Sequence, residues 1–203
     1  VTGSSELILR NLSTTASIRV VSRLRHWGNM IEENPYEDRF ERTFAFVDLS
    51  GFTTFTDRWG DKAAVEVLND FRFLVRTVAS RKGIRIAKWL GDGAMLVAVE
   101  PETATEAIME MLDSLAQSDA PLELRAGLAS GPVLLVDGED YLGHAVNMAS
   151  RLCDQAEPGQ VLATSSMITS LMVNTPSTPI GKHQIKGFKE PIELVRLTRA
   201  NSV

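Results

Sequence analysis

The sequence predicts an α+β sandwich of the split βαβ kind, and three observations indicate this fold class. Apolar runs that are typical of strands alternate with segments of helical periodicity in the order β-α-β-β-α-β, with further elements at the end. Two of the predicted strands meet at a Gly-Asp-Gly turn, which is a strong hairpin signal. The length of 203 residues suits one domain with a sizeable core and a short appended segment.

Residues 1–42 are polar and differ in character from the rest of the chain, so we expect an N-terminal arm or linker there. A basic amphipathic stretch within it, around Ile18 to Arg25, is predicted to be helical, and Pro35 should end that helix.

Residues 43–203 make up the predicted domain. Its strands are expected at 43–49, 84–90, 94–100, 122–138 and 159–165, with two more around the turn at 187–191. Its helices are expected at 60–83, where Gly83 ends the periodic pattern, at 101–117, where Pro101 stands near the start, at 143–156, and in a short piece near Met167.

Composition excludes several classes of protein. A formal net charge of −5 argues against a general nucleic-acid or membrane-surface binder, because such proteins usually carry a basic face. The single cysteine, Cys153, excludes an internal disulfide and fits a reducing compartment. No run of eighteen apolar residues and no signal-peptide core are present. We expect a cytoplasmic protein, or the cytoplasmic domain of a larger or membrane-attached one, that itself contacts neither nucleic acid nor membrane.

Two carboxylates mark a candidate metal site. Asp48 ends the apolar run in "FAFVDLSGFT", and Asp92 lies between two glycines in "KWLGDGAML". Each alone is typical of a turn or a helix cap. In the split βαβ topology, however, the first strand neighbours the central hairpin, so the two side chains should lie close together and repel unless a cation separates them. Oxygen ligands with flanking glycines suit Mg²⁺ or Mn²⁺ completed by substrate phosphates.

The segment Ser50–Gly51–Phe52–Thr53 adds backbone N–H groups at a helix start, which is a site for anions. A metal beside a phosphate site indicates a nucleotide. Neither a Walker-type loop nor a Gly-x-Gly-x-x-Gly motif is present, so the usual nucleotide-binding folds are disfavoured.

Four segments in order, "FAFVDLSGFTTFTD", "KWLGDGAMLVA", "LRAGLASGPVL" and "DYLGHAVNMASRL", resemble the catalytic domain of class III nucleotidyl cyclases over about residues 42–198. The resemblance implies that Asp48 and Asp92 hold two metal ions with the help of the Leu49 carbonyl. It also implies a ferredoxin-like fold, and a head-to-tail homodimer with two active sites shared at the interface.

The same resemblance assigns the base-reading positions to Lys88 and Asp140, which otherwise would pass for an exposed strand lysine and a loop charge. A lysine can donate to N1 of adenine and a carboxylate can accept from its amino group, whereas N1 of guanine carries a hydrogen. A site built around one such pattern discriminates strongly, because the wrong base leaves buried groups unpaired. This pair therefore favours ATP over GTP.

Asn147 and Arg151 are four residues apart and so share one helix face, which without the resemblance would indicate only a solvated surface. In the family the asparagine orients the ribose and the arginine stabilises charge on the phosphates. The family's phosphate-binding lysine is displaced in "KGFKEP", where Lys186 or Lys189 takes the role, with a slight preference for Lys189.

These positions predict an adenylate cyclase that forms 3′,5′-cyclic AMP and pyrophosphate from ATP by two-metal catalysis with Mg²⁺ or Mn²⁺. A guanylate or mixed-specificity cyclase is the nearest alternative, and a catalytically silent, nucleotide-binding dimerisation module is the other.

Overall fold

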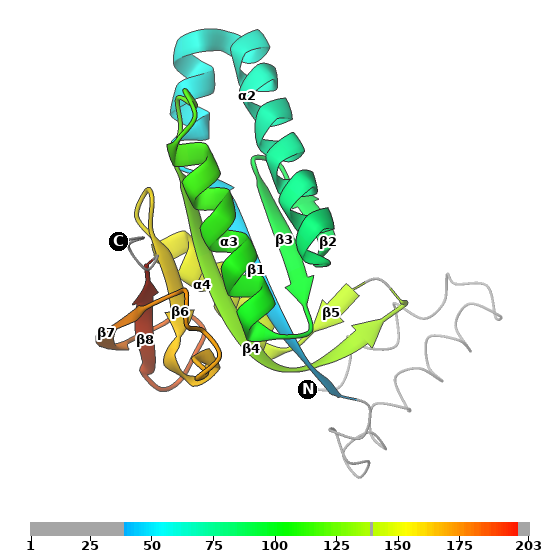
Figure 1. Ribbon diagram of the computed structural model, residues 1–203, viewed down its shortest axis with the longest axis vertical. Helices are drawn as coiled ribbons and strands as arrows, with labels where there is room; N and C mark the ends of the chain where they lie inside the picture. Colours follow the sequence, from blue (N-terminus) through cyan, green and yellow to red (C-terminus); the bar gives the residue numbers. More distant parts are fainter. Residues whose placement is uncertain (1–38, 139, 199–203) are drawn as a thin grey trace, which may run out of the picture. The chain divides into compact units, whose positions relative to one another are not determined.

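The computed structural model describes residues 39–138 and 140–198 (Figure 1). Most of the expected N-terminal arm therefore lies outside the described residues. The first strand begins at Phe40 rather than at Thr43, so the domain starts slightly earlier than the apolar pattern predicts.

One eight-stranded sheet forms the centre of the domain, with the order β2-β3-β1-β4-β6-β8-β7 and with β5 paired to β4. β4 and β6 are parallel, and the other neighbours are antiparallel. The strands are β1 (Phe40–Leu49), β2 (Arg85–Leu90), β3 (Gly93–Ala98), β4 (Leu124–Val136), β5 (Asp140–Leu142), β6 (Val161–Thr164), β7 (Ser177–His183) and β8 (Ile192–Leu197). The helices are α2 (Phe52–Lys82), α3 (Pro101–Ala116), α4 (His144–Gln155) and the 3-10 turn η2 (Ser165–Met167).

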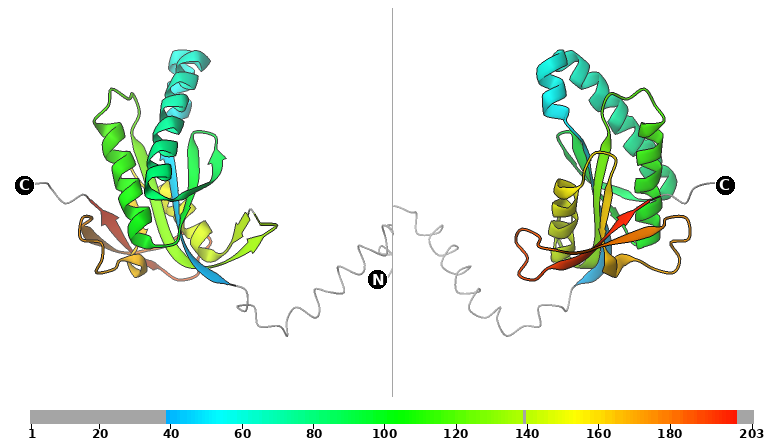
Figure 2. Two further views of the ribbon diagram at one scale, coloured as in Figure 1. Left: turned by 45° about the vertical axis from the view of Figure 1, so that its right-hand side comes forward. Right: turned by 90° about the vertical axis from the view of Figure 1, so that its left-hand side faces the viewer.

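The helices lie on both faces of the sheet, with α2 and α3 on one side and α4 on the other (Figures 1 and 2). Successive side chains of β1 point to opposite faces of the sheet, so this strand contributes to both cores. Ala45, Val47 and Leu49 pack in the core that contains the buried residues of α2 and α3. Phe44 and Phe46 pack with the buried residues of α4. By the same alternation, the side chain of Asp48 belongs to the α4 face.

The predicted split βαβ arrangement is confirmed, with β1 between the hairpin strand β3 and β4. The hairpin turns at Gly91, whose φ of 68° is the left-handed conformation that glycine adopts at little cost. Two details differ from expectation. α2 begins at Phe52 and continues through a break at Gly60, where φ is 79° and ψ is 170°. Asp140 begins the short strand β5, which the sequence pattern did not predict.

Within the described ranges, no helix has both the length and the apolar character needed to cross a membrane.

Candidate active site

The end of β1 meets the turn between β2 and β3, as the topology predicts. Asp48 pairs with Gly93 across the β1–β3 ladder, and the Leu49 N–H donates to the Asp92 carbonyl at 3.3 Å. The charge of Asp92 contributes to raising the pKa of Asp48, so the two carboxylates are close enough to interact electrostatically. The two predicted metal ligands are therefore neighbours, although they are 44 positions apart in the chain.

Gly93 leaves room beside the Asp48 carboxylate. A Cβ atom at this position would lie 2.7 Å from the Val47 carbonyl oxygen and 3.1 Å from Asp48 Oδ1. A larger residue would thus press on the carboxylate and on the strand that carries it. The second glycine of the Gly-Asp-Gly turn is required here by close approach rather than by a positive φ.

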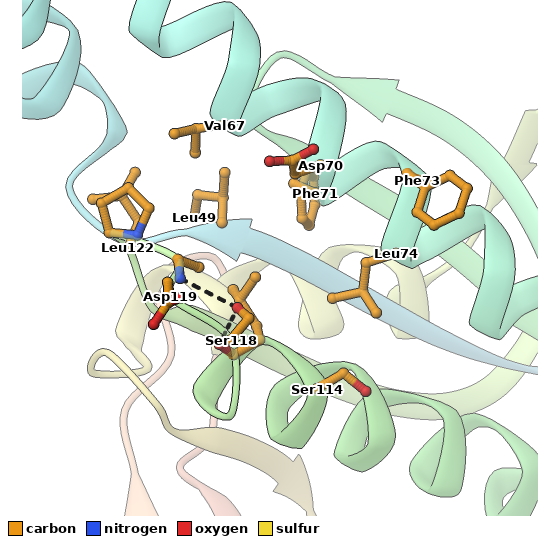
Figure 3. Close-up of a pocket in the computed structure, with 13 residues that line it drawn as sticks. Leu49, Val67, Asp70, Phe71, Phe73, Leu74, Ser114, Ser118, Asp119 and Leu122 are labelled. Atoms are coloured by element: carbon orange, nitrogen blue, oxygen red, sulfur yellow. Dashed lines mark hydrogen bonds between the residues drawn. The ribbon is translucent and has the colours of Figure 1, made fainter.

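The side chain of Leu49 points to the opposite face. It is 2% exposed and lines a cavity of about 410 Å³ between α2, α3 and the connection after α3, together with Val67, Phe71 and Leu122 (Figure 3). Only the backbone of Leu49 is therefore available to a ligand on the Asp48 side, and the role of its carbonyl oxygen as a metal ligand stays a prediction.

These groups fit a hard divalent cation. Two interacting carboxylates and a backbone carbonyl are all oxygen donors, as Mg²⁺ and Mn²⁺ prefer. Among the residues that the structure describes, no three His, Cys, Asp or Glu side chains gather into a metal cage. A cation at Asp48 and Asp92 would therefore need oxygen atoms from elsewhere, such as substrate phosphates, to complete its shell.

Arg125 is the residue of this site that the sequence analysis did not single out. Its Nε and Nη2 donate to Asp48 Oδ2 at 3.0 and 2.7 Å, and its Nη1 donates to the Asp154 carbonyl at 3.3 Å. The signal for it is strand register, because Arg125 stands directly opposite Asp48 on β4.

The electrostatic influences on Asp48 oppose one another. Burial raises the pKa of Asp48, the hydrogen bonds from Arg125 lower it, and the charge of Asp92 raises it again, with a net rise. For Arg125, burial alone would lower the pKa, but the hydrogen bonds that it donates to Asp48 hold it above its usual value. Burial together with the negative charges of Asp92 and Asp154 therefore outweighs the favourable effects of Arg125 on the Asp48 carboxylate, and a further positive charge at this point would be favourable.

The two predicted base-reading residues also meet. The Lys88 ammonium forms an ion pair with the Asp140 carboxylate, and both line a cavity of about 450 Å³. Its walls are largely apolar, and include Phe46, Met95 and Tyr141. Since Lys88 pairs with Met95 across the β2–β3 ladder, it lies on the same α4 face of the sheet as Phe46 and Asp48.

α4 carries Asn147 and Arg151 on its exposed side, which confirms that the two share a helix face. Arg151 Nη1 donates to Asp154 Oδ2 at 3.2 Å. Gly127 on β4 sets the position of this helix, because a Cβ atom there would lie 2.1 Å from the Cys153 backbone nitrogen and 2.3 Å from the Ala149 carbonyl oxygen. Burial raises the pKa of Cys153 to about 12, so this thiol is a protonated packing group as expected.

The connection between β7 and β8 lies against the start of α4. The Phe188 ring packs edge-on against His144 with centroids 5.8 Å apart. Lys186 and Lys189, on either side of this anchor, are both exposed. Both candidate phosphate lysines are therefore within two residues of Phe188, which contacts the first residue of the helix that carries Asn147.

The segment that is predicted to bind an anion lies at the N-terminus of α2. Gly51 is the N-cap residue with φ of 79°, and no side chain caps the helix there. The Phe55 N–H bonds to the Gly51 carbonyl, so the helix starts directly after the strand end that carries Asp48. The uncapped N–H groups of Phe52 and Thr53 are available to an anion.

Known proteins resemble this chain in sequence and in fold. Residues 36–198 match the family described as the adenylate and guanylate cyclase catalytic domain. An adenylate cyclase of Streptomyces coelicolor is 31% identical over 147 residues, which is 71% of this chain and 38% of that protein. An uncharacterized Mycobacterium tuberculosis protein is 36% identical over 147 residues, covering 72% of this chain and 38% of its own length. This chain therefore spans less than two-fifths of these curated relatives.

Solved structures share the fold. The adenylyl cyclase CyaB from P. aeruginosa superposes with a TM-score of 0.69 at 23% identity, over 81% of this chain and 96% of that one. The guanylate cyclase domain of RhGC from Catenaria anguillulae, in complex with GTP, gives a TM-score of 0.71 at 22% identity, over 78% of this chain and 96% of that one. The family match spans most of the chain, and the chain belongs to the adenylate and guanylate cyclase catalytic domain family.

Proposed function

We propose that this chain is an adenylate cyclase, which converts ATP into 3′,5′-cyclic AMP and pyrophosphate, with a catalytic domain that starts at β1 (Phe40–Leu49) and with the residues before it as an arm or linker. The observation that carries the choice of ATP is the Lys88–Asp140 pair in an apolar-walled cavity of about 450 Å³. The pair presents one donor and one acceptor side by side, which matches N1 and the amino group of adenine. Guanine would instead place an N–H against the Lys88 ammonium, and that mismatch costs binding free energy.

In the proposed reaction the ribose 3′-oxygen attacks the α-phosphorus in line, and the 3′-hydroxyl proton passes to Asp48 or to solvent. The bond between the α-phosphorus and the oxygen that bridges to the β-phosphorus breaks, and pyrophosphate leaves. Held by Asp48, Asp92 and the Leu49 carbonyl, two Mg²⁺ or Mn²⁺ ions would lower the pKa of the 3′-hydroxyl and neutralise the triphosphate. The N–H groups after Gly51 bind phosphate oxygens at the start of α2. Arg125 meanwhile keeps the Asp48 carboxylate oriented through its two hydrogen bonds.

Asn147 orients the ribose, and Arg151 stabilises the negative charge that develops on the phosphates. Both are exposed on α4, where a bound nucleotide can contact them. Lys189, beside the Phe188 anchor, is our choice for the lysine that holds the terminal phosphates.

The proposed assembly is a head-to-tail homodimer with two shared sites. Each site takes Asp48 and Asp92 from one chain and the base-reading and α4 residues from its partner. Support comes from the rim of the base cavity, where Leu90 and Leu142 are 45% and 60% exposed and Val136 is 40% exposed. Exposed apolar side chains around a cavity are typical of a surface that a partner covers.

The test is to incubate the purified chain with ATP or with GTP in the presence of Mn²⁺ and to resolve the products by chromatography. We expect cyclic AMP from ATP at a much higher rate than cyclic GMP from GTP, and no product from Asp92→Asn. Cyclic GMP as the main product would make the chain a guanylate cyclase. Nucleotide binding without any product would indicate a silent dimerisation module.

A further inference from the structure

A side chain of α2 reaches the turn that carries Asp92. Arg72 Nη2 donates to the Gly91 carbonyl at 3.3 Å, one residue before Asp92. The same guanidinium lies over the Trp89 ring, 5.4 Å from its centroid. Phe71 packs edge-on against the same indole, with its ring 6.4 Å from that of Trp89. α2 is thus connected to the end of β2 by an aromatic contact, a cation–π contact and a hydrogen bond.

The turn benefits from such support because of its composition. Gly91 and Gly93 flank Asp92, and glycine leaves the backbone free to adopt many conformations. On one side the β1–β3 ladder holds the turn, through the pair Asp48–Gly93 and the Leu49–Asp92 hydrogen bond. Arg72 holds it from the α2 side, at the Gly91 carbonyl.

The placement of Arg72 has a cost. Its Nε is buried and has no hydrogen-bond partner among the residues that the structure describes. A buried N–H without a partner is unfavourable, so an arginine at this position would be hard to explain by stability alone.

We propose that Arg72 is a positioning residue for the metal site: its guanidinium, held on Trp89, fixes the Gly91 carbonyl and thereby the direction of the Asp92 carboxylate. The inference rests on the proposed function, since it assumes that Asp92 is a metal ligand. Its consequence is that the loss of Arg72 weakens metal binding at a site that Arg72 does not itself touch.

Arg76 provides a matched control on the same helix. Its guanidinium also lies over Trp89, 5.0 Å from the ring centroid. No hydrogen bond joins it to the turn in the described part of the chain. Replacing Arg76 therefore removes a cation from the same aromatic ring but leaves the Gly91 carbonyl bonded.

The experiment compares Arg72→Gln, Arg72→Lys and Arg76→Gln with the wild-type chain, by titration with Mn²⁺ alone and measurement of free Mn²⁺ by electron paramagnetic resonance. Arg72→Gln removes the hydrogen bond from the guanidinium to the Gly91 carbonyl. From the usual free energy of one such bond, we expect the half-saturating Mn²⁺ concentration to rise by about three- to tenfold. Arg76→Gln should stay within about twofold of wild type. Arg72→Lys should recover part of the loss, because its ammonium extends farther from the backbone than the glutamine amide and can donate to the carbonyl. The midpoint of urea unfolding, measured without metal, shows whether each variant is folded. If Arg72→Gln does not fold, Arg72→Lys tests the inference, and its half-saturating Mn²⁺ concentration should lie above that of the wild type by less than the change expected for Arg72→Gln.

Equal Mn²⁺ affinity of the wild type and the Arg72 variants would overturn the inference, as would an equal loss in Arg76→Gln. Asp92→Asn separates this outcome from a failure of the proposed function. If Asp92→Asn binds Mn²⁺ as well as wild type, or if the wild type binds none, the metal site itself is wrongly assigned and the role of Arg72 falls with it.

Discussion

Replacing Arg125 by alanine should destabilise the folded chain, because the partly buried Asp48 carboxylate would lose its hydrogen-bond partner. The Asp48 carboxylate is 25% exposed and receives two hydrogen bonds from this guanidinium, at 3.0 and 2.7 Å. Hydrogen bonds to charged groups contribute about 1.5 to 3 kcal/mol, and the partial exposure of both side chains favours the lower half of that range. We therefore expect Arg125→Ala to lower the free energy of unfolding by about 2 kcal/mol near neutral pH, which is about 4 to 8 °C in Tm for a domain of this size.

The pH dependence gives the sign of the effect. The pKa of Asp48 is already raised in the folded chain, mainly by burial, so the folded state holds this proton more tightly than the unfolded state does. The stability that this group contributes is present below its unfolded pKa and is lost as the pH rises through its folded pKa. Arg125→Ala removes the interaction that lowers the pKa, so its destabilisation should be largest at neutral pH and should shrink in acid.

The assay is urea unfolding monitored by tryptophan fluorescence, with EDTA present, from about pH 4.5 to pH 8. The double variant Asp48→Asn with Arg125→Ala is the control, because it removes the unpaired charge and should regain most of the lost stability. A loss that is independent of pH and is not restored by Asp48→Asn would assign the effect to the packing of the arginine stem. A change below about 0.5 kcal/mol at neutral pH would show that the ion pair contributes nothing.

Three further changes test the site and the fold. Asp48→Ala and Arg151→Ala homodimers should each be almost inactive. Co-expression of the two variants should return roughly a quarter of wild-type activity, because half of randomly formed dimers are mixed and each mixed dimer keeps one whole site. Mixed dimers that are shown to form but have no activity would disprove the shared site. Lys88→Glu should reduce ATP turnover at least about tenfold by inverting the donor that faces adenine, and unchanged kinetics with ATP would exclude it as a base reader. Gly127→Ala should lower the free energy of unfolding by about 3 kcal/mol or more because its Cβ would lie 2.1 Å from a backbone nitrogen of α4. Gly131→Ala is the control, because its Cβ would lie 3.4 Å from its nearest neighbour, and its urea midpoint should stay close to that of the wild type. Similar midpoints for Gly127→Ala and Gly131→Ala would contradict the packing argument.

Local patterns in the sequence were sufficient for the elements that hold most of the site. The apolar run from Thr43 predicts the strand β1, whereas the separation of Phe44 and Ala45 into different cores is an observation of the structure. Gly91 predicts the hairpin because the turn requires a positive φ. The four-residue spacing of Asn147 and Arg151 predicts their common helix face, and the structure confirms it. Each of these inferences depends on residues close together in the chain.

The sequence also indicated that Asp48 and Asp92 are neighbours, but only once a topology was assumed. The order of strands then placed the end of β1 against the hairpin, and the Leu49–Asp92 hydrogen bond is the observed result. The assignment of Lys88 and Asp140 came from resemblance, and their contact depends on β5, a strand of 3 residues that is too short to stand out in the sequence.

Tertiary structure alone decided the contacts that adjust the chemistry. Arg125 bonds to Asp48 across 77 residues because the β1–β4 register sets them opposite each other, and a change of register by one residue would point them to different faces. Arg72 reaches the Asp92 turn because α2 packs over β2, at a sequence distance of 19 residues from Gly91. Residue type and periodicity determine which elements form and which face is buried. Register and packing between distant segments determine which charges meet, and local sequence does not encode these because their free energy depends on both partners at once.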